Sequence, residues 1–278
     1  MSEPIHEMTA AERVALVERE KHRITYRNIT LSFAGILLFL LIWEGLALSG
    51  IVDSRILCDV LEVLRLFVTK LSDPNPDGAV LTVHIWSSLQ VALLGFLLAV
   101  VIGVPLGWLM GWYRGADSFL RPLFEIIRPI PPVSWIPLTI VWLGIGLPAK
   151  SFIVFFAAFV PCLINAYTGI RQTKEVLKNV GKTFGASYFT VFVKVGIPSS
   201  LVMTFAGIKV AIGNAWATLV AAEMLAASSG LGYMILMGRS YARVDLIILG
   251  IVVIGVLGVI ISAIINRLER IFLGWRYV

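Results

Sequence analysis

Two ionisable residues lie inside long apolar stretches of the sequence and are the first candidates for chemistry. Glu223 belongs to the run WATLVAAE, and Lys209 precedes it by fourteen residues. On one helix these positions are about 21 Å apart at about 1.5 Å per residue, so the two side chains cannot pair with each other. For Glu223, a structural contact with a neighbouring helix and a gating role both stay open. Lys209 can face an anion or satisfy another helix.

Other residue patterns that are typical of catalysis are missing from the sequence. The three histidines lie outside the apolar stretches or at an edge of one, and the two cysteines, Cys58 and Cys162, lack metal-ligand spacing. The sequence has no G-x-x-x-x-G-K-S/T loop to cradle the phosphates of ATP. We therefore expect no catalytic residue, no metal site and no cofactor bound by this chain.

The overall composition is that of a membrane protein. Of the 278 residues, 58% are hydrophobic and 14% are charged, whereas soluble domains average roughly 45–50% apolar and about 25% charged residues. The formal charge of +6 could suggest a nucleic-acid partner, but the Lys and Arg residues cluster between the apolar stretches. That distribution favours membrane topology as the reason for the basic charge.

Six stretches are long and apolar enough to cross a hydrocarbon core, which takes about 20 residues as a helix. The third stretch is irregular, because it contains five prolines and needs residues just upstream to reach full length. The fifth stretch carries Lys209 and Glu223. The predicted spans are residues 31–49, 85–113, 129–149, 151–170, 197–227 and 246–266.

The basic residues between the spans predict the orientation. Five lie before the first span, five lie between the fourth and fifth spans, and the C-terminal tail adds three. Because Lys and Arg accumulate on the cytoplasmic side, both termini and the 171–196 connection are predicted to be cytoplasmic. The charged N-terminus is not a signal peptide. Its Thr9-Ala-Ala-Glu12 pattern is typical of a capping box that begins a short amphipathic helix.

The connection from Arg171 to Pro198 has the pattern of two short helices. Helical periodicity stops at Gly185-Ala186-Ser187, and a second amphipathic run then begins, with Ser187 as its N-cap, and ends at Pro198. Two helices joined at a glycine elbow would form a small projection outside the membrane. The alternative is an ordinary basic loop.

This connection resembles the coupling segment of bacterial ABC-importer permeases. That pattern reads E-A-A, three residues, Gly, nine residues and I-x-L-P. Aligned on Gly185, its last part falls on Val195-Gly196-Ile197-Pro198 with the same spacing, whereas Asn179-Val180-Gly181 stands where the glutamate and alanines are expected. The resemblance implies that an ATPase subunit contacts Asn179, Gly181, Thr183, Phe184, Gly185, Ala186, Ser187 and Pro198.

Three further segments, residues 84–111, 128–146 and 216–235, resemble permeases for nitrate, taurine and alkanesulfonates. The resemblance implies an all-α integral membrane protein with about six transmembrane helices and the fold of a type I ABC importer permease. We expect a cytoplasmic N-terminal segment at 1–30, the first transmembrane helix and an external loop at 31–83, the permease core at 84–268 and a cytoplasmic tail at 269–278.

The same resemblance implies the partners and the cargo. The partners would be two copies of an ABC ATPase that binds ATP and Mg, a second permease copy in a homodimer, and an external or periplasmic substrate-binding protein. The membrane would be the bacterial inner membrane. The cargo would be a small anion, with sulfonate or taurine first and nitrate-like anions next. The alternative is an ion-gradient-driven secondary transporter, whose two internal repeats we do not find in this sequence.

The proline-rich third span is the second functional candidate. Each internal proline removes a backbone hydrogen bond, and a broken helix is tolerated in a membrane only where it faces protein or water. The stretch from Pro129 to Pro137 is therefore predicted to line the translocation route or a dimer interface, and a simple packing kink is the alternative. The candidate path or gate residues are Pro131, Pro132, Ser134, Trp135, Lys209, Asn214, Trp216 and Glu223.

Overall fold

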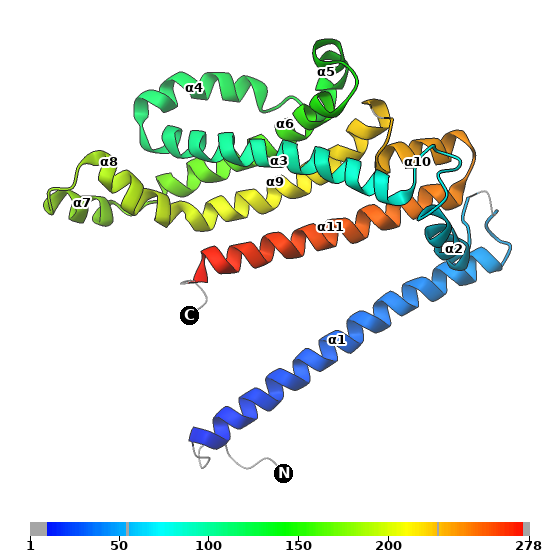
Figure 1. Cartoon of the computed structure of the whole chain (residues 1–278). Helices are drawn as coiled ribbons and strands as arrows, with labels where there is room; N and C mark the ends of the chain where they lie inside the picture. The colour runs from blue at the N-terminus through cyan, green and yellow to red at the C-terminus, as the bar shows by residue number, and fades with distance from the viewer. Residues whose placement is uncertain (1–9, 54–55, 227, 275–278) are drawn as a thin grey trace. The chain divides into compact units, whose positions relative to one another are not determined.

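The computed structural model describes residues 10–53, 56–226 and 228–274, and in these ranges the regular structure is entirely helical (Figure 1). The chain divides into two units, residues 1–64 and 65–278, which are described separately. The all-α fold class predicted from the sequence is confirmed. The helices are α1 (Ala10–Leu48), α2 (Val60–Lys70), α3 (Leu81–Trp112), α4 (Arg114–Ile127), η1 (Pro132–Trp135), α5 (Ile136–Leu143), α6 (Leu147–Arg171), α7 (Glu175–Thr183), α8 (Tyr188–Val191), η2 (Phe192–Gly196), α9 (Ile197–Ala226), α10 (Leu231–Ser240) and α11 (Val244–Phe272).

The first unit is built around α1, a single helix of 39 residues. The short N-terminal helix and the first span that the sequence predicts are therefore continuous, and Thr9 of the expected capping box lies outside the described residues. The part from Thr30 to Leu48 is long and apolar enough to cross a membrane. Near its end, Glu44 Oε2 accepts a hydrogen bond of 2.9 Å from the backbone N–H of Val60. Glu44 thus satisfies an unpaired donor at the start of α2.

The second unit has a three-helix core of α3, α6 and α9 (Figure 1). Small side chains meet at its centre, among them Ala99, Ala158 and Ala211, which are fully buried. A Cβ on Gly103 would lie only 3.2 Å from the carbonyl oxygen of Phe159, so glycine allows α3 and α6 to approach closely. This is the small-residue packing that membrane helices use in place of bulky apolar cores.

The third predicted span is not a single helix. Residues 129–149 contain η1 and α5, and α5 ends at Leu143, so that Pro148 already belongs to α6. The upstream helix α4 meets the η1–α5 pair at a bend of 84°, which makes a broken span or a re-entrant loop. Pro132 is the first residue of η1 and Pro137 is the second residue of α5. Proline is tolerated there because the first N–H groups of a helix have no intrahelical partner, so both prolines lie at the start of new helices.

The prediction that the second coupling helix ends at Pro198 is wrong. The helix runs on from Tyr188 to Leu225, through the π-helical turn η2 and into α9. Within this turn the N–H of Ile197 bonds to the carbonyl of Phe192. The wider turn directly precedes Pro198. In an ordinary helix the proline ring would clash with the preceding turn, and proline has no N–H to donate. The sequence shows the proline but not the wider turn that accommodates it.

The described residues contain five helices that are long and apolar enough to cross a membrane, or six if the bent α4–α5 pair is one span. This agrees with the predicted count. The helix α10, between α9 and α11, was not predicted, and its ten residues are too few to cross a membrane. In the second unit, α7 and α8 lie at one end of the long helices and α10 lies at the other (Figure 1). We call these the α8 end and the α10 end.

Candidate functional site

The predicted glycine elbow is present at the α8 end. Helix α7 stops at Thr183, and Gly185 follows with φ of +73°, a left-handed conformation that glycine adopts without steric cost. The N–H of Gly185 bonds to the carbonyl of Lys182 at 2.9 Å, and the N–H of Ala186 bonds to that of Gly181 at 3.0 Å. This pair of bonds is a Schellman motif, which satisfies the last carbonyls of α7 and reverses the chain.

The second half of the elbow begins where the sequence predicts it. Ser187 has extended backbone geometry, and its Oγ accepts a hydrogen bond of 3.1 Å from the N–H of Thr190. It is thus the N-cap of α8. Thr183 Oγ1 donates to the carbonyl of Asn179 at 3.0 Å, which reinforces the last turn of α7. The elbow therefore has a defined local geometry on both sides of the turn.

The outer surface of the elbow is apolar. The side chain of Phe184, directly before the turn, is 85% exposed. Val176, Leu177 and Val180 on α7 and Phe189 on α8 are exposed as well. An exposed apolar patch of this kind is typical of a surface that contacts another protein or a membrane.

The inner surface of the elbow is fixed to the end of α3. Tyr188 Oη donates a hydrogen bond of 2.9 Å to the carbonyl of Trp112, and their rings lie 5.4 Å apart. Phe192 packs on the other side, with its ring 5.6 Å from that of Trp112. Lys178 of α7 lies over the Trp112 ring at 5.2 Å. Sequence reasoning missed Trp112 and Tyr188, although aromatic residues that flank an apolar stretch could have indicated them.

At the α10 end, Glu223 forms the centre of a buried polar cluster. Its carboxylate is fully buried and accepts hydrogen bonds from Ser88 Oγ at 2.8 Å and from the N–H of Gly232 at 2.9 Å. Ser88 Oγ in turn accepts a bond of 2.8 Å from the N–H of Leu231. The buried ammonium group of Lys150 on α6 stabilises the carboxylate electrostatically. The cluster joins α3, α9 and α10.

A second buried chain of contacts continues from His84, one turn before Ser88 on α3. His84 Nδ1 accepts a hydrogen bond of 3.0 Å from the N–H of Gly230, so its Nε2 carries the proton that faces Asp77 Oδ2 at 3.0 Å. Asp77 is also paired with the buried Lys70. Burial works against the charged carboxylate, but the bonds from His84 and Lys70 outweigh it and hold the pKa of Asp77 below its usual range.

Two further path candidates contact α11. Lys209 on α9 forms an ion pair with Glu269 of α11. Trp216 Nε1 donates a hydrogen bond of 3.1 Å to the carbonyl of Ile254. Both residues therefore connect neighbouring helices, and Lys209 does not pair with Glu223.

The remaining path candidates do not form one cluster with these residues. Trp135 stacks on Phe156 of α6, with ring centroids 5.2 Å apart. Pro131 and Ser134 are exposed around η1, and Pro132 is half-buried. Asn214 is exposed on α9. The eight residues are thus distributed among a buried cluster, two contacts with α11, an exposed position on α9 and the broken span.

Comparisons with known proteins agree on the family. The model of the binding-protein-dependent transport system inner membrane component matches residues 103–273. The taurine transport system permease protein of Escherichia coli is 30% identical over 90% of each chain. The bicarbonate transport system permease protein of Synechococcus elongatus is 31% identical over 90% of this chain and 92% of its own.

A solved structure shows the same fold. A chain of the MetNI methionine ABC transporter, in an inward-facing conformation, superimposes with a TM-score of 0.59 at 20% identity, over 69% of this chain and 95% of its own. The chain therefore belongs to the family of binding-protein-dependent transport system inner membrane components and is a multi-pass permease subunit of an ABC transporter.

Proposed function

We propose that this chain forms the translocation path for a small anion that an external binding protein delivers, and that a partner ATPase drives transport by gripping the α7–α8 elbow. The observation that carries the proposal is the exposed Phe184 beside the left-handed Gly185. A large apolar side chain at the tip of a rigid turn fits a groove in another protein, because burying it there removes apolar surface from water.

The attachment of the elbow supports its use as a lever. Tyr188 and Phe192 fix it to the end of α3, and the continuous helix from Tyr188 to Leu225 connects it to α9. A force on the elbow therefore reaches two of the three core helices. In the proposed assembly two ATPase copies bind ATP and Mg, and two copies of this chain form a homodimer, since two-fold symmetry is the commonest closed arrangement.

The orientation follows from the distribution of basic residues. The elbow segment and both termini carry most of the Lys and Arg outside the helical core. We infer that the α8 end is cytoplasmic and that the α10 end faces outward. An ATPase in the cytoplasm can then reach the elbow, and a binding protein can reach the α10 end.

The proposed cargo class is a sulfonate, such as taurine, or a nitrate-like anion. The relatives in Escherichia coli and Synechococcus elongatus are named for taurine and for bicarbonate, both of which carry an oxyanion group. A common path for such solutes needs cationic rather than anionic side chains. The buried carboxylate of Glu223 is satisfied by its own hydrogen bonds and is therefore assigned to structure and not to substrate contact.

The test uses the complete transporter, with its ATPase and binding protein, in proteoliposomes. Labelled taurine, ethanesulfonate, nitrate and bicarbonate are offered in turn, with and without ATP. We expect ATP-dependent uptake of at least one of them. Phe184→Asp should reduce that uptake by about ten-fold or more, because a buried aromatic anchor of an interface is lost, whereas Phe184→Leu should keep most of it.

Two results would overturn the proposal. One is uptake by the chain without ATPase, driven by an ion gradient, which would identify a secondary transporter. The other is normal ATP-driven uptake by Phe184→Asp in correctly inserted protein. That result would remove the elbow from the coupling mechanism.

A further inference from the structure

Helix α4 carries a stripe of charged residues along one face. Arg114, Asp117, Arg121, Glu125 and Arg128 follow one another at intervals of three or four residues, which places them on the same side of a helix. The opposite side carries the apolar residues Phe119, Leu123 and Ile126, all of them exposed. An amphipathic helix of this kind turns its apolar side to lipid or protein and its charged side to water.

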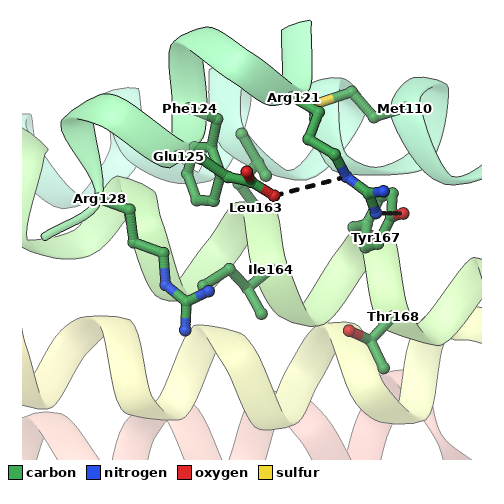
Figure 2. Close-up of a pocket in the computed structure, with 9 residues that line it drawn as sticks. All are labelled: Met110, Arg121, Phe124, Glu125, Arg128, Leu163, Ile164, Tyr167 and Thr168. Carbon is green, nitrogen blue, oxygen red and sulfur yellow. Dashed lines mark hydrogen bonds and ion pairs between the residues drawn. The ribbon is translucent and has the colours of Figure 1, made fainter. Parts of the chain in front are cut away.

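The charged stripe of α4 borders two adjoining cavities. The smaller, of about 230 Å³, lies between α4 and α6 (Figure 2). The larger, of about 710 Å³, extends from there to the elbow. Both are lined by Met110 and Arg121, so the two cavities adjoin at these residues, and we call them together the groove. The smaller cavity is lined by Met110, Arg121, Phe124, Glu125, Arg128, Leu163, Ile164, Tyr167 and Thr168.

The charge of this groove is predominantly positive. Its lining includes six cations, and only three carboxylates, those of Asp117, Glu125 and Glu175, balance them. A concave surface with charges of one sign and low-dielectric walls concentrates the field and attracts counter-ions. The cations are Arg114, Arg121, Arg128, Arg171, Lys178 and Lys182.

The two arginines of the smaller cavity differ in their partners. Arg121 lies 3.5 Å from Asp117 and 3.8 Å from Glu125, and it also donates to Tyr167 Oη. Its charge is therefore largely compensated. Arg128 forms no ion pair with any carboxylate in the part of the chain that the structure describes. Its guanidinium points away from the Glu125 carboxylate, which faces Arg121 (Figure 2).

We propose that Arg128 is an anion subsite in the inner half of the translocation path. The guanidinium offers a planar pair of donors that matches a sulfonate, carboxylate or bicarbonate group. Phe124, Leu163 and Ile164 line the same cavity and can contact a short organic tail. The groove then leads the anion past Arg121 toward the elbow. This inference rests on the proposed function, since it assigns the groove to the path of the same anion.

The experiment measures the local potential with charged thiol reagents and needs no transport. The complete transporter with Thr168→Cys is prepared in a background of Cys58→Ala and Cys162→Ala, in nanodiscs of phosphatidylcholine. The rate of modification by the anionic sulfonatoethyl methanethiosulfonate is divided by the rate for its cationic trimethylammonium analogue. Arg128→Gln should lower this ratio by about ten-fold, because it removes one charge that attracts one reagent and repels the other.

Matched variants show whether the change in the ratio is specific to the charge of Arg128. Arg128→Lys should keep most of the ratio, and Arg239→Gln, an exposed arginine on α10, should leave it unchanged. Unlabelled ethanesulfonate should slow modification when Arg128 is present and not in Arg128→Gln. An unchanged ratio in Arg128→Gln, or equal slowing in both proteins, would overturn the subsite.

A lipid headgroup carries the same anionic chemistry, so a second arm adds phosphatidylglycerol to the nanodiscs. The ratio should stay high, since a free anion is the proposed occupant. A large fall in the ratio on adding this lipid would assign the groove to a headgroup and overturn the proposal.

The outcomes also separate the proposed function from the proposed anion subsite. If no anion is taken up but the ratio depends on Arg128, the proposed function fails and the anion subsite stands. If an anion is taken up and the ratio of modification rates is the same with and without Arg128, only the subsite fails.

Discussion

The two ends of the helical core use polar residues in opposite ways. At the α10 end, His84, Ser88 and Glu223 are completely buried; Ser88 bonds to Glu223, all three accept backbone N–H groups at the start of α10, and His84 Nε2 faces Asp77. At the α8 end Phe184 is exposed, and in the cavity between α4 and α6 the guanidinium of Arg128 has no carboxylate partner among the described residues. At the α10 end the carboxylate of Glu223 has its hydrogen-bond partners within the chain, whereas Phe184 and Arg128 can contact molecules outside it.

This difference indicates which part of the core holds the helices together and which part binds other molecules. Removing a buried carboxylate from its two hydrogen-bond donors costs free energy, because each donor is then left unpaired in apolar surroundings. An exposed aromatic side chain and an unpaired cation contribute favourable free energy only when they bind a partner. The buried cluster at the α10 end therefore holds the helices together, and the exposed groups of the other half fit the proposed contacts with an ATPase and an anion.

The largest expected effect tests the holding role of Glu223. Replacing it by Ala leaves Ser88 Oγ and the N–H of Gly232 without an acceptor and creates a void, which should cost about 3–5 kcal/mol of unfolding free energy. Thermal unfolding of the purified chain in detergent measures the loss. Asn214→Ala, at an exposed position of the same helix, should change stability by less than about 0.5 kcal/mol. Equal stability of the two variants would contradict the comparison.

A smaller effect on stability, with a larger one on function, is expected at Gly185. Valine there would have to adopt φ of +73°, at a cost of about 1–3 kcal/mol that deforms the elbow. Insertion should continue while ATP hydrolysis loses its link to uptake, as measured by the ratio of transported solute to ATP consumed. Gly115→Ala, in open space on α4, is the control and should behave as the native protein. Normal coupling in Gly185→Val would show that the elbow tolerates distortion.

The smallest effect is confined to acidic solution and concerns Asp77. Because its pKa is lower in the folded chain than in the unfolded one, its contribution to stability is complete above the unfolded value of about 4 and is lost as the pH falls through the folded value. The thermal midpoint of the native chain should therefore fall on acidification more steeply than that of Asp77→Asn. Asp73→Asn, in the same loop, should retain the native pH dependence. If the thermal midpoints of the native chain and of Asp77→Asn fell equally with pH, Asp77 would not be the source of the pH dependence.

Much of the fold was predictable because it depends on local properties of the chain. The lengths of the apolar stretches predict α3, α6 and α11, since a membrane helix is defined by its own residues. The elbow was predictable for the same reason. Gly185 and Ser187 act within one turn of their own position, through a left-handed backbone and an N-cap bond.

The broken span and the helix through Pro198 were harder to predict. Prolines show that a helix is interrupted, but not whether it bends, restarts or passes through a wider turn. In the structure Pro132 and Pro137 restart helices, whereas Pro198 is accommodated after the π-helical turn. The outcome depends on how neighbouring helices hold the flanking turns, which local sequence does not specify.

What the sequence determined by itself is therefore the number of apolar helices, the asymmetry of basic charge and the glycine elbow, all of which arise from residues close together in the chain. Only the tertiary structure decided the meaning of the charged residues. Ser88 and Glu223 are 135 positions apart, and His84 and Gly230 are 146 apart. Whether a charge is satisfied or available depends on which helices pack together, and that is why Glu223 is enclosed while Arg128 faces an open groove.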